Sequence, residues 1–148
     1  MQTRHRVRAT VNIVNLSTPL GLLIALTGAR RMSRGPRGLV FARGYRLPIP
    51  PAPAFTVGNV ILQRRGEDDI ENSPDLLAHE ERHTTQYAVS LGPVMILLYV
   101  LASGVSWVLC GCPACYNPYE RLAGLADGGY IRHQLRRLRR RAAPAPPP

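Results

Sequence analysis

Three residues in the segment 79–83 have the types and the spacing needed to bind a metal ion and to use it. His79, Glu80 and His83 form an H-E-x-x-H pattern. On a helix, two histidines four residues apart project from one face about 6 Å apart, close enough to hold one divalent cation. The glutamate beside the first histidine can then act as general base on a metal-bound water. The pattern therefore predicts a metal site on a helix, with Glu80 as its base.

A third protein ligand is expected, because zinc sites that activate water usually have three. Glu120 is the best candidate, since it lies on a later helix that should pack against the first and is followed by small residues that permit close approach. Glu120 also stands three residues after Asn117, so closing a capping box is the alternative explanation for it. The sequence predicts Zn²⁺ bound by His79, His83 and Glu120.

The histidine motif, followed by an N-P-Y-E-x-x-A stretch at 117–123, resembles the gluzincin group of zinc metallopeptidases, in which a second helix supplies a glutamate ligand. The T-x-G-x-x-I stretch at 56–61 and the L-L-A-H-E-x-x-H-x-x-Q stretch at 76–86 are similar to small peptidase-like domains of bacterial toxin and injection-system proteins. The resemblance implies a zincin-like fold and a hydrolase that cleaves a peptide or protein substrate. The strand Thr56–Leu62 would line the cleft and add the substrate to its free edge.

The residues around the expected ligands depart from the gluzincin pattern at one position. Many gluzincins have an acidic residue four positions after the glutamate ligand, and this chain has Gly124 there. Asp127 lies on the same expected helical face and is predicted to orient His79 instead, while Gln86 is predicted to lie beside His83. Glu81 and Arg82 fill the variable positions of the motif and are expected on a solvated face. Four residues are candidates for stabilising the oxyanion: Tyr116, Tyr119, Tyr130 and His133.

The elements that must position these residues form an α+β, mainly α, arrangement. Asn72 or Ser73 can cap a helix that begins with Pro74 and runs to Gly92-Pro93, and Asn117 can cap a second one that reaches Asp127. Other helices are expected at 18–28, 94–110 and 130–141. Strands are expected at 39–42 and, with a bulge or bend at Gly58, at 54–63. We expect three regions: an apolar helix with a Pro- and Arg-rich connector (1–53), a metal-binding domain (54–130) and a basic, Pro-rich tail (131–148).

Charge and apolar patterning bear on the partners. The formal net charge is +10, all of it from arginine, which suits an anionic membrane surface. Nucleic acid is the weaker alternative, since no aromatic residue lies between Arg132 and Pro148 to stack on bases. Residues 94–110 are strongly apolar and can be a buried helix or one inserted into a membrane. The alternative function is therefore a non-catalytic, membrane-associated or interaction protein that retains the metal site.

Three cysteines, at 110, 112 and 115, lie within six residues of one another. An odd count in one short segment does not suggest a disulfide framework, so a reducing, cytoplasmic location is expected, with possible membrane association. The same three thiols with His133 offer soft ligands to a second metal. That arrangement competes with a purely structural role.

Overall fold

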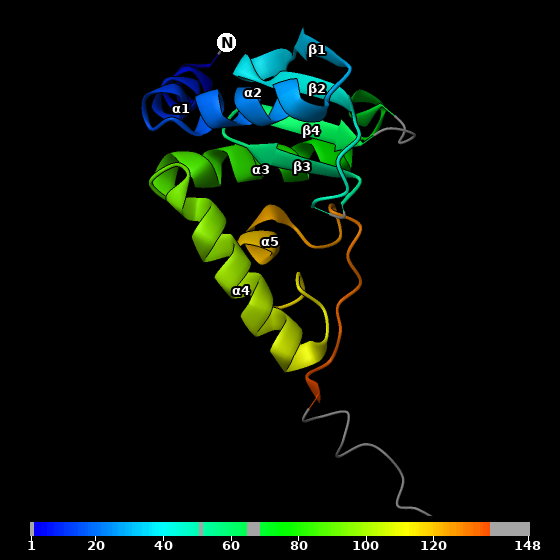
Figure 1. Cartoon of the computed structure of the whole chain (residues 1–148). Helices are drawn as coiled ribbons and strands as arrows, with labels where there is room; N and C mark the ends of the chain where they lie inside the picture. The colour runs from blue at the N-terminus through cyan, green and yellow to red at the C-terminus, as the bar shows by residue number, and fades with distance from the viewer. Residues whose placement is uncertain (1, 51, 65–68, 137–148) are drawn as a thin grey trace, which may run out of the picture.

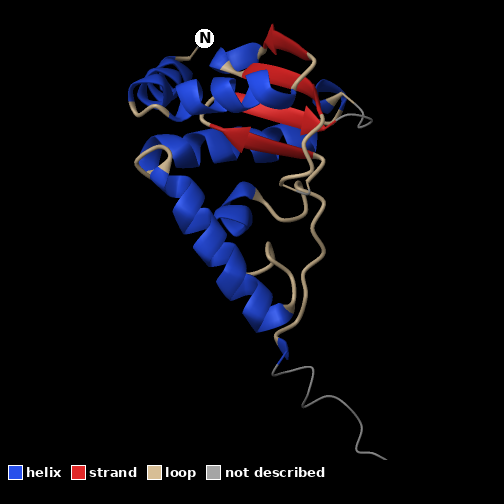
Figure 2. Ribbon diagram, viewed as in Figure 1, coloured by secondary structure: helices blue, strands red, loops and turns tan. Residues whose placement is uncertain are grey.

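A computed structural model describes residues 2–50, 52–64 and 69–136, and it has an α+β fold built on one mixed four-stranded sheet. The strands are β1 (Arg31–Arg34), β2 (Val40–Tyr45), β3 (Ala54–Val57) and β4 (Val60–Arg64), and their order across the sheet is β1-β2-β4-β3. Only β2 and β4 are parallel. β3 is the last strand in this order and is therefore an edge strand. The sheet lies at one end of the molecule, as Figure 2 shows.

Residues 54–64 form a hairpin and not the single strand predicted for 54–63. The chain reverses at Gly58, where φ is +62°, so that Thr56 pairs with Ile61. A Cβ at Gly58 would lie 2.4 Å from the backbone nitrogen of Thr18, and glycine is therefore required on two counts. The apolar residues on both sides of the turn read as one continuous run, which is why the sequence did not separate the two strands.

Two helices precede the sheet. The predicted helix at 18–28 is confirmed as α2 (Ser17–Gly28), which packs on the sheet. α1 (Thr3–Val14) was not predicted, because its buried residues are the polar Arg8 and Asn12 and give no apolar signal. The amide of Asn12 in α1 is fully buried and donates hydrogen bonds to Asn59 Oδ1 and Thr84 O, at 2.9 and 2.8 Å. This residue links α1 to the hairpin turn and to the third helix.

The remaining helices are α3 (Pro74–Val89), α4 (Val94–Cys110) and α5 (Pro118–Ala123). α3 lies beside β3 and also contacts α5, while α4 extends away from the sheet (Figure 1). The prediction that the α5 helix reaches Asp127 is wrong, because Gly124, with φ +91°, ends it. Residues 130–135 are not helical and Arg136 is, while residues 137–148, which include the rest of the helix predicted at 130–141 and most of the predicted tail, lie outside the described residues.

Packing on the two faces of the sheet follows the two-residue period of the strands. Val60 and Leu62 of β4 point toward α2, and Ile61 between them joins a cluster with the leucines at the start of α3. The sheet is therefore covered on both faces and draws strands from both sides of residue 53. The boundary expected between residues 53 and 54 falls within this one sheet.

α4 is largely exposed. Only Met95, Ser106 and Cys110 among its residues are buried, while Leu97 and Leu101 are each 67% exposed. Within the described residues, no single helix has both the length and the apolar character to cross a membrane. The bent pairs α1 with α2 and α3 with α4 pass such a test only when each pair is taken together.

Candidate metal centre

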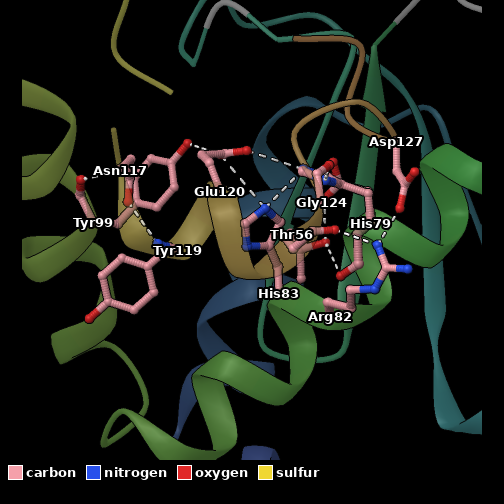
Figure 3. A network of polar contacts seen from close by, with 12 residues as sticks. Thr56, His79, Arg82, His83, Tyr99, Asn117, Tyr119, Glu120, Gly124 and Asp127 are labelled. Carbon is pink, nitrogen blue, oxygen red and sulfur yellow. Dashed lines mark hydrogen bonds and ion pairs between the residues drawn. The ribbon is translucent and has the colours of Figure 1, made fainter. Parts of the chain in front are cut away.

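The two histidines of α3 and the glutamate of α5 meet at one buried point (Figure 3). His79 Nε2 lies 3.1 Å from His83 Nε2 and 3.3 Å from Glu120 Oε2, and His83 Nε2 lies 3.7 Å from Glu120 Oε1. One ligand atom from each residue lies within 4.8 Å of the others. Glu120 lies 37 positions after His83 in the sequence, and the contact between α3 and α5 brings it to the two histidines.

Hydrogen bonds on the far side of each ring define which nitrogen faces this point. His79 Nδ1 lies 2.9 Å from the carbonyl oxygen of Gly124, which can only accept, so Nδ1 carries the proton. His83 Nδ1 lies 2.8 Å from Gln86 Oε1, and the Gln86 amide is oriented because its Nε2 donates to Tyr119 O. Both Nε2 atoms therefore direct lone pairs at the same point. Lone pairs 3.1 Å apart beside a carboxylate require a proton or a metal ion between them.

Glu120 is placed as a ligand would be, and it does not close a capping box. Asn117 caps α5 by accepting a hydrogen bond from the Tyr119 amide, while the Glu120 carboxylate turns toward the histidines. Tyr99 donates to Glu120 Oε1, while the buried Oε2 has no hydrogen bond within the described part of the chain and only the 3.3 Å contact with His79 Nε2. Burial raises the pKa of Glu120, but hydrogen bonds and the charge of the histidines outweigh it and lower the pKa overall. A buried carboxylate that stays ionised needs a cation nearby.

The electrostatics at His79 agree with this requirement. Burial lowers the pKa of His79, but the carboxylates of Glu120 and Glu80 outweigh burial and raise the pKa above its ordinary value. The surroundings therefore favour the protonated form of this imidazole when no metal is bound. The same negative surroundings would attract a divalent cation.

Glu80 occupies a different position from the three candidate ligands. Its side chain is buried, and Thr56 Oγ1 of β3 donates a hydrogen bond to Glu80 Oε2 at 2.7 Å. Burial raises the pKa of Glu80, which brings a carboxylate closer to the range useful for a general base near neutral pH. The threonine of the T-x-G-x-x-I stretch thus contacts the predicted base directly.

The prediction that Asp127 orients His79 is wrong. The Asp127 carboxylate pairs with Arg82, which also donates to Ala123 O, and the Gly124 carbonyl occupies the position beside His79 Nδ1. Glu81 is likewise not on a solvated face, because it is paired with arginines from other elements, at 2.8 Å with Arg8. The position of Asp127 differs from the prediction because α5 is short, so that the chain after Gly124 forms a loop around His79.

A cavity of about 660 Å³ opens onto the cluster. β3 forms one wall through four consecutive residues, and His79, Glu80, His83 and Glu120 lie at its polar end. The remaining wall is apolar and comes from α2, the 47–52 connector and α4. Of the four predicted oxyanion residues, only Tyr130 lines the cavity. Tyr99 also lines it and was not predicted, because it lies in an apolar run that carries no polar signal.

The donor set of two imidazole nitrogens and one carboxylate is the one that zinc accepts in water-activating sites, with room for a non-protein ligand on the cavity side. The cluster therefore fits a single zinc ion better than calcium or magnesium, which prefer oxygen ligands.

Comparisons with models of protein families, with curated protein sequences and with solved structures found no match.

Proposed function

We propose that the chain is a zinc-dependent metallopeptidase of the gluzincin kind. The observation that supports this most is the convergence of two imidazole lone pairs and a partly unpartnered carboxylate at the polar end of a cavity, with a separate buried carboxylate beside them. The ion would be held by His79, His83 and Glu120. When bound, it would acidify a water molecule and polarise the substrate carbonyl.

The residues of the chain have distinct tasks in this proposal. Thr56 holds one oxygen of Glu80, which leaves the other oxygen free to accept a proton from the attacking water and to deliver it to the leaving nitrogen. Tyr130 lines the cavity and can donate a hydrogen bond to the developing oxyanion. Tyr99 holds Glu120 in place through its hydroxyl group.

The substrate would be a peptide or protein segment in extended conformation. β3 lies at the edge of the sheet and along the cavity, so its backbone can pair with an added strand. The apolar lining from α2 and α4 favours bulky apolar side chains beside the scissile bond.

The proposal is tested by zinc analysis together with cleavage of a fluorescently labelled unfolded protein. Both measurements are made in a Cys112→Ser/Cys115→Ser background, so that sulfur ligands cannot contribute zinc. We expect about one zinc per chain, loss of zinc in His79→Ala, and retention of zinc with loss of cleavage in Glu80→Gln. Cleavage that persists in Glu80→Gln, or zinc that persists in His79→Ala/His83→Ala, would contradict the proposal.

A second candidate function is that of a non-catalytic, membrane-associated protein, and the exposure of α4 favours it. Two leucines of one face, Leu97 and Leu101, together with Trp107 near the far end, are more than half exposed. An apolar helix beside arginine-rich segments suits the interface of an anionic bilayer. Co-sedimentation with phosphatidylserine-containing vesicles tests it, with Leu97→Ser/Leu101→Ser as the variant expected to stay in solution. Equal recovery of both proteins in the supernatant would exclude this role.

A further inference from the structure

A second group of metal-binding side chains lies at the far end of α4, away from the candidate zinc centre. Cys112 and Cys115 are buried and His133 is exposed, and one ligand atom from each lies within 4.8 Å of the others. Cys110, which the sequence grouped with them, is outside this cluster and is buried, with its Sγ 3.2 Å from Ser106 O. Cys112 and Cys115 are joined as a disulfide, contrary to the expectation from their odd number.

Backbone amide groups are directed at both sulfur atoms. The Cys115 amide donates to Cys112 Sγ at 3.2 Å, and the His133 amide donates to Cys115 Sγ at 3.3 Å. Such hydrogen bonds stabilise a sulfur that carries negative charge, as a metal-bound thiolate does. The loop itself is held by Ser106, whose Oγ donates to Cys112 O and accepts from the Tyr116 amide.

A metal bound by His133 would restrain a longer part of the chain than the disulfide does. The disulfide closes a loop of sequence separation 3, so it restrains little of the unfolded chain. A metal that also binds His133 would connect positions 18 residues apart. That longer loop contains α5 with Glu120 and the segment around Gly124 that contacts His79. A link across it would hold this segment against α3.

We propose that the reduced chain binds a second, thiophilic divalent metal ion, of which zinc is the simplest example, through Cys112, Cys115 and His133. A dithiol reductant transfers two electrons to the disulfide and becomes a disulfide itself, leaving two cysteine thiols. The metal ion then replaces one proton on each thiol, and both protons pass to solvent. The ion fastens the two ends of the segment that carries Glu120, and its ligands are separate from those of the site proposed for catalysis.

Cobalt(II) binding to the full-length protein tests this proposal, because only thiolate ligands give an intense near-ultraviolet charge-transfer band. The experiment uses reduced His79→Ala/His83→Ala protein, in which the first site is removed. We expect one cobalt per chain with this band, and loss of both in the same protein carrying Cys112→Ser/Cys115→Ser. His133→Ala in this background should weaken cobalt binding by at least about tenfold. Removing a residue that only hydrogen-bonds to a metal ligand already costs about 10- to 100-fold in affinity, and His133 is proposed to be a ligand itself.

Cys110→Ser is the matched control, because it removes a buried thiol at the end of α4, outside the cluster, and it should leave the cobalt band unchanged. Thiol counting provides a second measurement on the reduced wild-type chain, which does not depend on the variants folding. Zinc should protect two of the three cysteines from a thiol reagent until a chelator is added. Failure of the reduced protein to bind cobalt, or equal reactivity of all three thiols with and without zinc, would overturn the proposal. Both outcomes are separate from the test of peptidase activity.

Discussion

Gly128 offers the sharpest test of the first metal centre, because it contacts His79 and no metal ligand would be changed directly. A Cβ placed at this residue would lie 2.6 Å from His79 Cε1, 2.8 Å from Nε2 and 2.9 Å from Nδ1. Three atoms of one ring are therefore too close, so rotating the ring in place does not relieve the contact. Gly128→Ala must move either the imidazole or the loop.

The required movement can be compared with what a metal site tolerates. Ordinary contact begins near 3.4 Å, so the ring or the loop must shift by about 0.8 Å, while metal–ligand distances hold to within about 0.2 Å. We expect zinc affinity to fall by about 10- to 100-fold if the ring moves, which is about 1.4–2.7 kcal/mol. If the ring stays, the overpacked loop should instead destabilise the metal-free protein by about 1–3 kcal/mol.

Two measurements separate these outcomes: competition for zinc with a chromogenic chelator, and urea unfolding of the metal-free protein. Gly104→Ala is the matched control, since a Cβ there has no atom within 4 Å and the residue lies inside α4. That variant should be more stable by about 0.5–1 kcal/mol with unchanged zinc affinity. Gly128→Ala protein with wild-type affinity and wild-type stability would show that the loop does not enclose His79 as described.

The remaining predictions concern residues that hold the candidate ligands and the base. Gln86→Leu removes the acceptor for His83 Nδ1 and should weaken zinc binding by about 10- to 100-fold. Gln86→Glu keeps an acceptor and should lose less zinc affinity. Similar chelator competition curves for the two variants would contradict this prediction. Arg82→Met frees the loop that Arg82 binds and should lower zinc affinity by up to about tenfold. The free energy of unfolding should change by less than about 1 kcal/mol, because the Arg82–Asp127 pair is partly exposed. A larger loss of stability in urea unfolding would count against this prediction. Thr56→Val removes a hydrogen bond that favours the ionised form of Glu80, so the pKa of Glu80 should rise and the acidic limb of the cleavage rate should move to higher pH. Thr56→Ser should keep the wild-type pH profile, and an acidic limb in the same place for both variants would refute this role.

The first part of the site could be predicted because its signals are local. A four-residue spacing on a helix places His79 and His83 on one face whatever the rest of the chain does. Glu120 required a further step, and the capping alternative could be resolved only by the direction of its side chain. Asn117 does cap the helix through its side-chain oxygen, but its backbone amide donates to Ala114 O, so the Glu120 carboxylate is not used for capping.

The groups that orient the ligands were harder to predict, because some of them are backbone atoms. The acceptor for His79 is the carbonyl of Gly124, and any residue type has a carbonyl. Tyr99 lies in an apolar helix whose composition gives no sign that one hydroxyl group reaches Glu120. Asp127 has the right charge for the role assigned to it, but the early end of α5 directs it to Arg82 instead. Long-range packing and the place where a short helix ends decided each of these contacts.

The segment after Glu120 connects several features that appear unrelated along the sequence. Gly124 supplies a carbonyl to one ligand, Gly128 leaves room for the ring of that ligand, and both need the segment to pass close to α3. Among the described contacts, the segment is held near its start by Arg82 and beyond its end by the cysteine cluster, since the His133 amide donates to Cys115 Sγ. Loosening either attachment should therefore weaken the metal centre without touching a ligand. At the far end, Cys115→Ala removes the sulfur that the His133 amide contacts and should appear as weaker zinc binding by His79, His83 and Glu120.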